Sequence, residues 1–423
     1  MPKFTYRKMK SRFLKRVLNS NKTSSVGRVI ILTGARQTGK TTLAKQCFAD
    51  YSYLSIEDPV LSIQYKKLTA AQWKANYPFA ILDEVQKEPV LINSIKSVYD
   101  QYEDVRYVLL GSSQLLLLEK VKETLAGRCI IEEVMPLTLP ELLTDSWDDI
   151  CELSLFQRFM TNFKLDSLLP SFSLYDDFSK RNSVYEYYLQ YGGYPALVKS
   201  DLSEEERREW LKMYVRTYLE RDVRDLANFR SLEPFVKVQQ MSALMTGQLI
   251  NVSQFGNEAD VNIKTAKRFL QYLEISYQTI YLQSWHRNKL KRLVKMQKLH
   301  YLDPGVHRAI LNKKGAMSGH EYESAVIAEI YKQIKVLKVG CDLYHLRTHD
   351  GAEVDLLLEF ETGYVAIEVK MTDNVLPKDA RHLKKLDDWL DKPVIHSFVL
   401  SNDNSVKKLG ENITAMPAAM FLT

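Results

Sequence analysis

The residues most able to do chemistry lie in a glycine-rich segment, residues 34–41. It reads Gly-Ala-Arg-Gln-Thr-Gly-Lys-Thr, which fits the GxxxxGK[ST] spacing of a phosphate-binding loop (P-loop). Glycines let backbone N–H groups turn toward a β-phosphate, and the N-terminus of the following helix adds partial positive charge. We expect Lys40 to reach the β- and γ-phosphates of ATP, and Thr41 to give a hydroxyl to Mg²⁺. The other residues of this segment that are predicted to bind nucleotide are Gly34, Arg36, Thr38, Gly39 and Thr42.

An acidic pair, Asp83 and Glu84, supplies the second half of such a site. It follows the apolar run at residues 79–82, so it lies where a buried strand would end. We expect Asp83 to hold Mg²⁺ through water and Glu84 to polarise the attacking water. Ser113 follows another apolar run, where its hydroxyl could sense the γ-phosphate. The alternative is a glycine turn with an unrelated acidic loop, but two motifs in the right order and context argue against it.

A second set of charged residues lies toward the C-terminus. Residues 351–360 and 364–370 are predicted to be strands that pair around a short turn, which sets Asp355 beside Glu368. These two carboxylates and the backbone carbonyl after Glu368 would bind Mg²⁺ through hard oxygen ligands. Lys370 would orient an attacking water and offset charge in the transition state of phosphodiester hydrolysis. The alternative is an ion-paired network that keeps its charges and cuts nothing.

A basic helix is predicted from residue 262 to residue 270. Asn262 caps it, and an apolar face begins at Ile263, while Lys264, Lys267 and Arg268 project elsewhere, as a DNA recognition helix requires. A basic ribbon follows, and its cations would contact the phosphate backbone. Those cations are Arg287, Lys289, Lys291, Arg292, Lys295 and Lys298. The alternative is a hinge between domains whose basic faces are only solvated.

The elements that must position these residues follow from hydrophobic patterning. Short apolar runs alternate with helix-length segments, which indicates a parallel sheet covered by helices. Those runs lie at residues 28–33, 51–56, 79–82 and 106–110. Helical signals dominate residues 184–245, and residues 232–299 predict three helices followed by a two-stranded ribbon. A helix around 321–336 then precedes the two strands that carry Asp355 and Glu368.

Composition limits the class of protein. The chain has 423 residues, 45% of them hydrophobic and 26% charged, with a net charge of +6. These values fit a soluble multidomain protein, and they permit nucleic-acid binding without demonstrating it. No apolar run is long enough for a bilayer span, and the basic N-terminus lacks the features of a secretory signal. The four cysteines have no CxxC spacing, so we expect a reducing, cytoplasmic location. Because no apolar run could span a bilayer, we expect no membrane partner.

The chain resembles a family of prokaryotic AAA-like P-loop ATPases, close to the STAND class of nucleotide switches, whose members carry a C-terminal domain related to PD-(D/E)xK nucleases. The matching landmarks are GARQTGKTTL at 34–43, LDEVQ at 82–86, LLGSS at 109–113, LAGR at 125–128, YGGYPALV at 191–198 and TYLERDVRDL at 217–226. The resemblance implies that Ser113 or Ser112 is the sensor. It also implies that Arg128 contacts nucleotide phosphates, within one chain or across a subunit interface, unless it is an ordinary ion-paired arginine. In the C-terminal domain it adds Glu323 as a further acidic catalytic residue.

The predicted fold is therefore α/β, in three parts. Residues 1–230 are expected to form a P-loop NTPase domain with a helical extension, 231–310 a winged-helix domain, and 311–423 a domain like that of restriction endonucleases. The leading hypothesis is a DNA-binding ATPase whose nucleotide state controls a Mg²⁺-dependent nuclease. The rival is a nucleotide-gated switch whose inactive C-terminal domain engages a protein partner or DNA ends. A homo-oligomer is also open.

Overall fold

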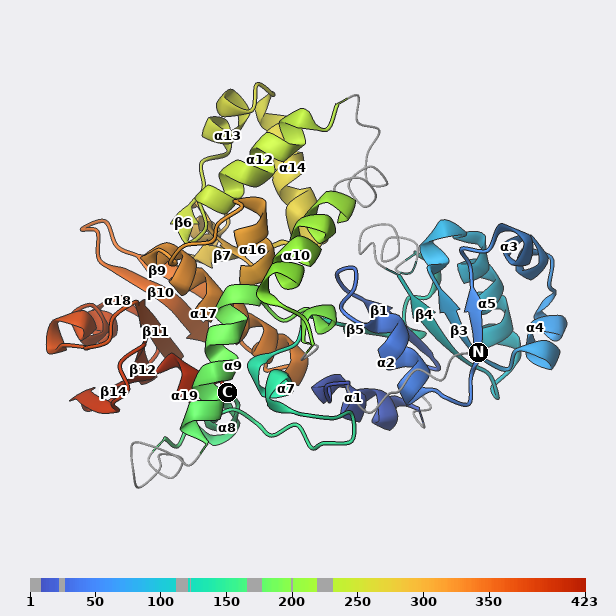
Figure 1. Cartoon of the computed structure of the whole chain (residues 1–423), viewed down its shortest axis with the longest axis horizontal. Helices are drawn as coiled ribbons and strands as arrows, with labels where there is room; N and C mark the ends of the chain where they lie inside the picture. Colours follow the sequence, from blue (N-terminus) through green and yellow to red (C-terminus); the bar gives the residue numbers. More distant parts are fainter. Residues whose placement is uncertain are drawn as a thin grey trace.

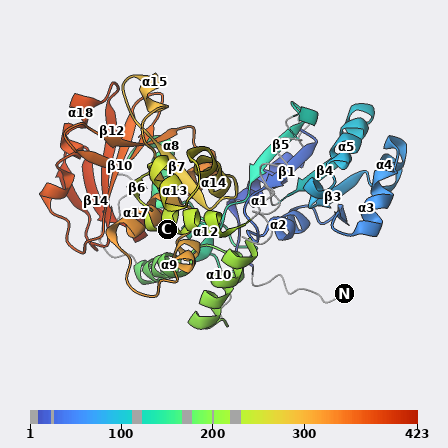
Figure 2. The same ribbon diagram turned by 90° about the horizontal axis from the view of Figure 1, so that it is seen from above.

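The structure is a computed structural model that describes most of the chain. The described residues are 9–22, 27–111, 121, 123–165, 177–198, 201–218 and 231–423. Within them the chain forms two separate sheets, which Figure 1 shows on opposite sides of the molecule. Helix α1 (Phe13–Asn21) lies between them in Figures 1 and 2.

The N-terminal sheet has five strands in the order β2-β3-β4-β1-β5. All neighbouring strands pair in parallel, which confirms the predicted parallel sheet. The strands are β1 (Val29–Thr33), β2 (Ser52–Ser55), β3 (Phe79–Asp83), β4 (Arg106–Leu110) and β5 (Cys129–Glu133). Because parallel strands end at one edge, the segments after β1 and β3 lie on the same side of the sheet.

Helices cover both faces of this sheet. They are α2 (Lys40–Cys47), α3 (Pro59–Lys66), α4 (Ala70–Asn76) and α5 (Val90–Gln101). Buried side chains of α2 and α1, such as Leu43 and Leu18, share one apolar cluster with Ile30 and Ile81 of the strands. Trp73 of α4 belongs to the cluster on the other face, and its side chain is fully buried. Burial on both faces explains why these strands are continuous apolar runs.

The second sheet has nine strands in the order β13-β14-β12-β11-β10-β9-β7-β8-β6. Its strands are β6 (Gln248–Leu249), β7 (Thr279–Ser284), β8 (Lys298–Tyr301), β9 (Asp342–Arg347), β10 (Glu353–Glu359), β11 (Tyr364–Lys370), β12 (Val394–Ser401), β13 (Lys407–Gly410) and β14 (Ile413–Pro417). The pair β7 and β9 joins the ribbon after the three helices to the C-terminal strands, with Gln283 beside Tyr344. One sheet therefore contains both the ribbon of β7 and β8 and the C-terminal strands.

The remaining helices surround this sheet. They are α7 (Leu139–Leu143), α8 (Leu155–Asn162), α9 (Phe178–Tyr191), α10 (Glu204–Tyr218), α12 (Glu233–Leu244), α13 (Val252–Glu258), α14 (Ile263–Ile275), α15 (Lys289–Arg292), α16 (Pro304–Ile310), α17 (Gly319–Leu337), α18 (Leu386–Trp389) and α19 (Ala418–Leu422). Helices α12, α13 and α14 precede the antiparallel pair of β7 and β8, so the predicted order of three helices and a ribbon is confirmed.

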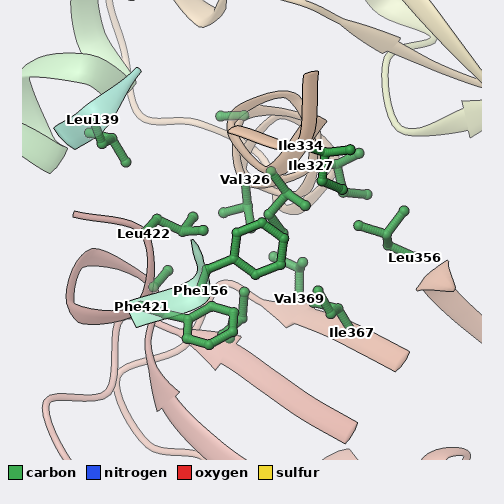
Figure 3. Close-up of a cluster of buried hydrophobic side chains, with 14 of the residues drawn as sticks. Leu139, Phe156, Val326, Ile327, Ile334, Leu356, Ile367, Val369, Phe421 and Leu422 are labelled. Atoms are coloured by element: carbon green, nitrogen blue, oxygen red, sulfur yellow. The ribbon is translucent and has the colours of Figure 1, made fainter. Parts of the chain in front are cut away.

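The largest apolar core joins segments that are far apart in sequence. Leu139 of α7 and Phe156 of α8 lie in one cluster with α17, α19 and the inner strands. Figure 3 shows Phe156 between Val326 of α17 and Phe421 of α19, and the two phenylalanine ring centroids lie 5.5 Å apart. Residues that directly follow the N-terminal sheet thus pack into the C-terminal core.

The predicted boundaries at 230/231 and 310/311 stay a prediction. Helices α7, α8 and α9, which the prediction assigns to the first domain, contribute to the C-terminal core. The sheet pairing of β7 with β9 crosses the second boundary. Packing alone therefore groups helices α7, α8 and α9 with the C-terminal sheet rather than with the N-terminal one.

Candidate functional site

The glycine-rich segment joins β1 to α2 and depends on its first and last glycines. Gly34 has φ +144°, and a Cβ there would lie 2.3 Å from the carbonyl oxygen of Val134. Gly39 is the N-cap of α2 and has φ 91°, in the left-handed region. Side chains at either position would strain the backbone, so only glycine lets the loop turn tightly onto the helix.

Lys40 lies over the loop that it follows. Its ammonium donates to the carbonyl oxygens of Gly34 at 2.8 Å and Ala35 at 2.7 Å, and the side chain is buried. The Thr38 hydroxyl donates to the same Ala35 carbonyl at 2.9 Å. A triphosphate would offer Lys40 anionic oxygens in place of these neutral carbonyls, which is a stronger partner for an ammonium.

The two halves of the predicted nucleotide site meet. The Thr41 hydroxyl donates to Asp83 Oδ2 at 2.8 Å, although the residues are 42 positions apart. Asp83 is buried at the end of β3, and Glu84, directly after it, has φ 58° and accepts a hydrogen bond from Gln86. A hydroxyl and a carboxylate at this separation fit Mg²⁺, which takes few protein ligands and keeps several waters.

Sequence reasoning missed two residues of this site. The Tyr53 hydroxyl, on β2, donates to Asp83 Oδ2 at 2.8 Å. Burial and this hydrogen bond raise the pKa of Tyr53, so it stays a neutral donor. Arg12, just before α1, donates to the carbonyl oxygens of Thr38 at 3.4 Å and Met135 at 2.7 Å. Neither residue belongs to a motif, and only the strand order and the position of α1 bring them here.

Other predicted nucleotide contacts have different outcomes. Arg36 is half-buried in the loop, and Thr42 is exposed on α2. Ser113 and Ser112 lie outside the described residues. Arg128 pairs with Asp100 of α5 at 2.8 Å, as the ion-paired alternative expected.

Arg128 cannot reach the P-loop of its own chain. In the parallel pair of β1 and β5, Val29 lies beside Cys129 and Thr33 beside Glu133. Arg128 therefore lies at the edge where β1 begins, whereas the loop follows the edge where β1 ends, roughly 13 Å away along the strand. The prediction of a contact within one chain is wrong for this arrangement, and a contact across a subunit interface stays a prediction.

The P-loop also touches the parts of the chain beyond its sheet. Tyr277, in the turn between α14 and β7, places its hydroxyl 3.3 Å from Thr33 Oγ1 and 3.3 Å from Glu133 Oε1. Pro195, in the YGGYPALV segment, lies 3.8 Å from the position of a Cβ on Gly39. One end of the P-loop thus adjoins Tyr277, which packs in the core of the second sheet, and the other end adjoins Pro195 in the segment after α9.

The C-terminal charged residues also come together. Strands β10 and β11 pair antiparallel with Leu356 beside Ile367, which confirms the predicted hairpin and sets Asp355 next to Glu368. Lys370 donates to Glu368 Oε1 at 2.6 Å. The backbone N–H of Val369 donates to Asp355 Oδ2 at 2.8 Å, and the role of its carbonyl as a metal ligand stays a prediction.

Lys298 of β8 lies inside this cluster. Its ammonium is 2.7 Å from Glu323 Oε1, 2.7 Å from Glu353 Oε1 and 3.3 Å from Asp355 Oδ1. Its side chain is 3% exposed. Burial lowers the pKa of Lys298, but the three carboxylates outweigh burial and raise it, so the ammonium stays charged. The prediction that Lys298 belongs to an exposed basic ribbon is wrong, because these carboxylates hold it in the interior.

Burial governs the protonation of the cluster. It raises the pKa of Glu368 to about 8, with a further increase from Asp355. Burial and Asp355 also raise the pKa of Glu323. Within the described ranges, no group of three or more His, Cys, Asp or Glu side chains is arranged to hold a metal ion. The carboxylates of Asp355 and Glu323 instead face Lys298, so in this arrangement the cluster does not fit the predicted Mg²⁺.

The predicted DNA contacts divide into exposed and buried residues. Lys264, Lys267 and Arg268 are exposed on α14, and Arg287, Lys289, Lys291 and Lys295 are exposed around α15. Arg292 differs from the prediction, because it is buried in an ion pair with Glu359 and cannot meet a phosphate backbone. Ile263 is 55% exposed at the first turn of α14, so the apolar face of that helix begins at Ala266 instead.

Three family models match successive parts of the chain. A model described as AAA domain matches residues 26–143. Two models described as domains of unknown function, DUF8612 and DUF4143, match residues 182–316 and 318–421. None of the described helices is both long and apolar enough to cross a membrane.

Similar proteins span most of the chain. An uncharacterized protein of Mycobacterium tuberculosis is 23% identical over 414 residues, which cover 93% of this chain and 81% of the relative. An uncharacterized protein of Haemophilus influenzae is 21% identical over 377 residues, or 82% of this chain and 84% of the relative.

Among solved structures, the Walker-type ATPase of Pyrococcus abyssi matches with a TM-score of 0.45 and 15% identity, covering 70% of this chain and 94% of that chain. A STAND protein of Pyrococcus horikoshii with a tetratricopeptide repeat sensor matches with a TM-score of 0.28 and 11% identity. The match covers 80% of this chain and 50% of that chain. The AAA match covers the parallel sheet, the P-loop and Asp83 together. Residues 26–143 are thus similar to an AAA domain and have the parallel sheet and P-loop of such a domain.

Proposed function

We propose that this chain is an ATP-hydrolysing switch that binds DNA and whose nucleotide state controls the C-terminal carboxylate–lysine cluster. The observation that carries the proposal is the hydrogen bond between Thr41 and Asp83, because it brings both halves of a nucleotide site to one edge of the sheet. Bound Mg²⁺ would neutralise charge on the β- and γ-phosphates.

The residues of the nucleotide site have separate roles in this proposal. The Lys40 ammonium exchanges the carbonyl oxygens of Gly34 and Ala35 for phosphate oxygens. Asp83, held by Thr41 and Tyr53, orients the water shell of the metal. Glu84 accepts a proton from the attacking water, for which its position directly after Asp83 is suited.

The link from nucleotide to the rest of the chain rests on contacts at the P-loop. Thr33 directly precedes Gly34 and meets Tyr277, while Gly39 adjoins Pro195. A change in the loop on ATP binding therefore acts at once on the turn before β7 and on the segment after α9. Because β7 pairs with β9, that change reaches the sheet that carries Asp355 and Glu368.

The proposed DNA contact rests on exposed cations. Lys264, Lys267 and Arg268 form one set on α14, and those around α15 form another. Lysine and arginine at the surface bind the phosphate backbone without reading sequence, so affinity should fall steeply with salt. The winged-helix assignment of this segment belongs to the same proposal, since three helices and an antiparallel pair are the elements it needs.

A second function is favoured by a specific observation. Lys298 forms ion pairs with Glu323, Glu353 and Asp355, as in an inert ion-paired core. In this case the C-terminal domain cuts nothing and engages a protein partner or DNA ends, and ATP gates that engagement.

One set of measurements tests both functions. Calorimetry with Mg²⁺ should detect ATP binding by the wild type and none by Lys40→Ala; absence of wild-type binding removes the whole proposal. Incubation with linear and circular DNA, Mg²⁺ or Mn²⁺, and with or without ATP then separates the two. Cleavage that Lys370→Ala abolishes supports a nuclease, whereas intact DNA throughout supports the binding switch. Digestion by Lys370→Ala at the wild-type rate would mean that the cleavage comes from elsewhere.

A further inference from the structure

The carboxylate cluster already contains a cation that comes from the chain itself. Lys298 is fixed by its strand, because β8 pairs with β7 on one side and with β6 on the other. From there its ammonium contacts carboxylates on two further elements, Glu323 of α17 and Glu353 and Asp355 of β10. Such an arrangement is a preformed cation site, in which the ammonium of Lys298 stands where a metal ion would bind.

An ammonium and a divalent metal cannot share these oxygens. Mg²⁺ needs carboxylate oxygens at about 2.0–2.1 Å, and an ammonium about 3 Å from the same oxygens would then be a close like charge. Both oxygens of Asp355 already have a partner, since Oδ1 faces Lys298 and Oδ2 accepts the Val369 N–H. The lysine therefore excludes the metal both by charge and by occupying the ligands.

One carboxylate oxygen is left over. Glu368 Oε1 accepts from Lys370, whereas Glu368 Oε2 is buried and has no hydrogen-bond partner within the described part of the chain. The side chain of Glu368 is only 6% exposed. A buried oxygen without a partner is costly, and a cation bound beside Asp355 would satisfy it.

We propose that Lys298 decides which cation this cluster holds: its ammonium keeps divalent metal out, and the cluster takes Mg²⁺ or Mn²⁺ once that ammonium leaves. This inference deepens the proposed control of the C-terminal domain, but it concerns metal binding alone. It survives if the chain neither hydrolyses ATP nor cuts DNA. Strand β8, which carries Lys298, is the element through which the three-helix segment would act on the cluster.

The test measures Mn²⁺ binding to the full chain without nucleotide, by electron paramagnetic resonance of the free ion. Lys298→Met keeps the length of the side chain and removes its charge. We expect it to bind one Mn²⁺ at least about tenfold more tightly than the wild type does, and the double variant with Asp355→Asn to lose that ion. Lys295→Met, an exposed lysine of the same segment, is the matched control and should bind as the wild type. If Lys298→Met binds Mn²⁺ no more tightly than the wild type does, the proposal is overturned.

The loss of Lys298 leaves carboxylates facing one another, so Lys298→Gln, which still donates hydrogen bonds, is the second variant. Folding of either variant with Mn²⁺ but not without it supports the proposal as directly as a binding curve. The wild type gives an independent answer. It should bind no more Mn²⁺ than Asp355→Asn does, and an ion in the wild type that Asp355→Asn removes would overturn the proposal.

Discussion

The hydroxyl of Tyr277 lies 3.3 Å from the hydroxyl of Thr33, the last residue before the P-loop. The same tyrosine hydroxyl donates to Glu133 at 3.3 Å, so one buried side chain joins two adjacent strand ends of the N-terminal sheet. Burial raises the pKa of Tyr277, with Glu133 adding to it, so the phenol remains a neutral hydrogen-bond donor. This hydrogen bond links the residue that precedes the phosphate-binding loop to the turn before β7 of the second sheet.

Removal of that hydroxyl should weaken the coupling between ATP and DNA. Tyr277→Phe keeps the ring and should cost about 1 kcal/mol of folding free energy for the lost hydrogen bonds. We expect ATP affinity by calorimetry to remain close to that of the wild type, while the effect of ATP on DNA affinity, read by fluorescence anisotropy, declines.

The matched control is Tyr281→Phe, whose hydroxyl donates to the Leu270 carbonyl at 3.1 Å, away from the P-loop. It should lose similar stability and keep the ATP effect on DNA. Equal ATP effects in both variants and the wild type would show that Tyr277 does not transmit nucleotide state.

Glu84→Gln should separate ATP binding from hydrolysis. The amide cannot accept a proton from water, so we expect kcat to fall by about 10²–10⁴, with ATP affinity retained because Lys40 and Thr41 are untouched. Phosphate release and calorimetry measure the two quantities. A variant that hydrolyses ATP at more than half the wild-type rate would exclude Glu84 as the base.

Gly193→Ala should disrupt the packing between the segment after the N-terminal sheet and the rest of the chain. A Cβ there would lie 2.2 Å from the Leu137 carbonyl oxygen, a backbone atom with little freedom to move. The Gly193 carbonyl and N–H also bond Leu137 and Asp303, at 2.7 and 2.8 Å. We expect a loss of about 1–3 kcal/mol, measured by urea unfolding. Gly340→Ala, with open space around the added carbon, should change stability far less.

The pH dependence of stability should carry the signature of Glu368. Its pKa is raised from 4.5 to about 8 in the folded chain, so between these values the folded state binds more protons than the unfolded state. Stability therefore falls as pH rises from about 4.5 to about 8, and the loss is complete above that range.

Glu368→Gln removes the ionisable group and should flatten the part of the curve that Glu368 contributes. Chemical unfolding of both proteins at intervals from pH 5 to pH 9 measures the difference. Parallel curves over that range would mean that Glu368 ionises at a similar pH in the folded and unfolded chains.

Local motifs carried much of the prediction. The P-loop and Asp83 were found because each follows its own strand, and the strand register then brings Thr41 to Asp83. The hairpin that sets Asp355 beside Glu368 was found because two short strands flank a turn. In both cases the information lies within a few residues of the site.

The rest depends on packing between segments that are far apart in sequence. Tyr53 and Arg12 reach the nucleotide site only because of strand order and the position of α1. Lys298 is one lysine in a basic stretch, and nothing beside it in sequence indicates that Asp355, 57 positions later, holds it. Phe156 and Phe159 of α8 are buried in the C-terminal core, and no residue near them in sequence indicates that partner.

The ion pairs of Lys298 have a consequence for how this protein can change over generations. Residues 182–316 and 318–421 match separate family models, yet Lys298 in the first forms ion pairs with Glu323 and Asp355 in the second. A gene that acquired a foreign C-terminal half would inherit a stranded lysine or a set of mutually repelling acids. Exchange of either half alone should therefore be selected against, and the two should descend as one unit.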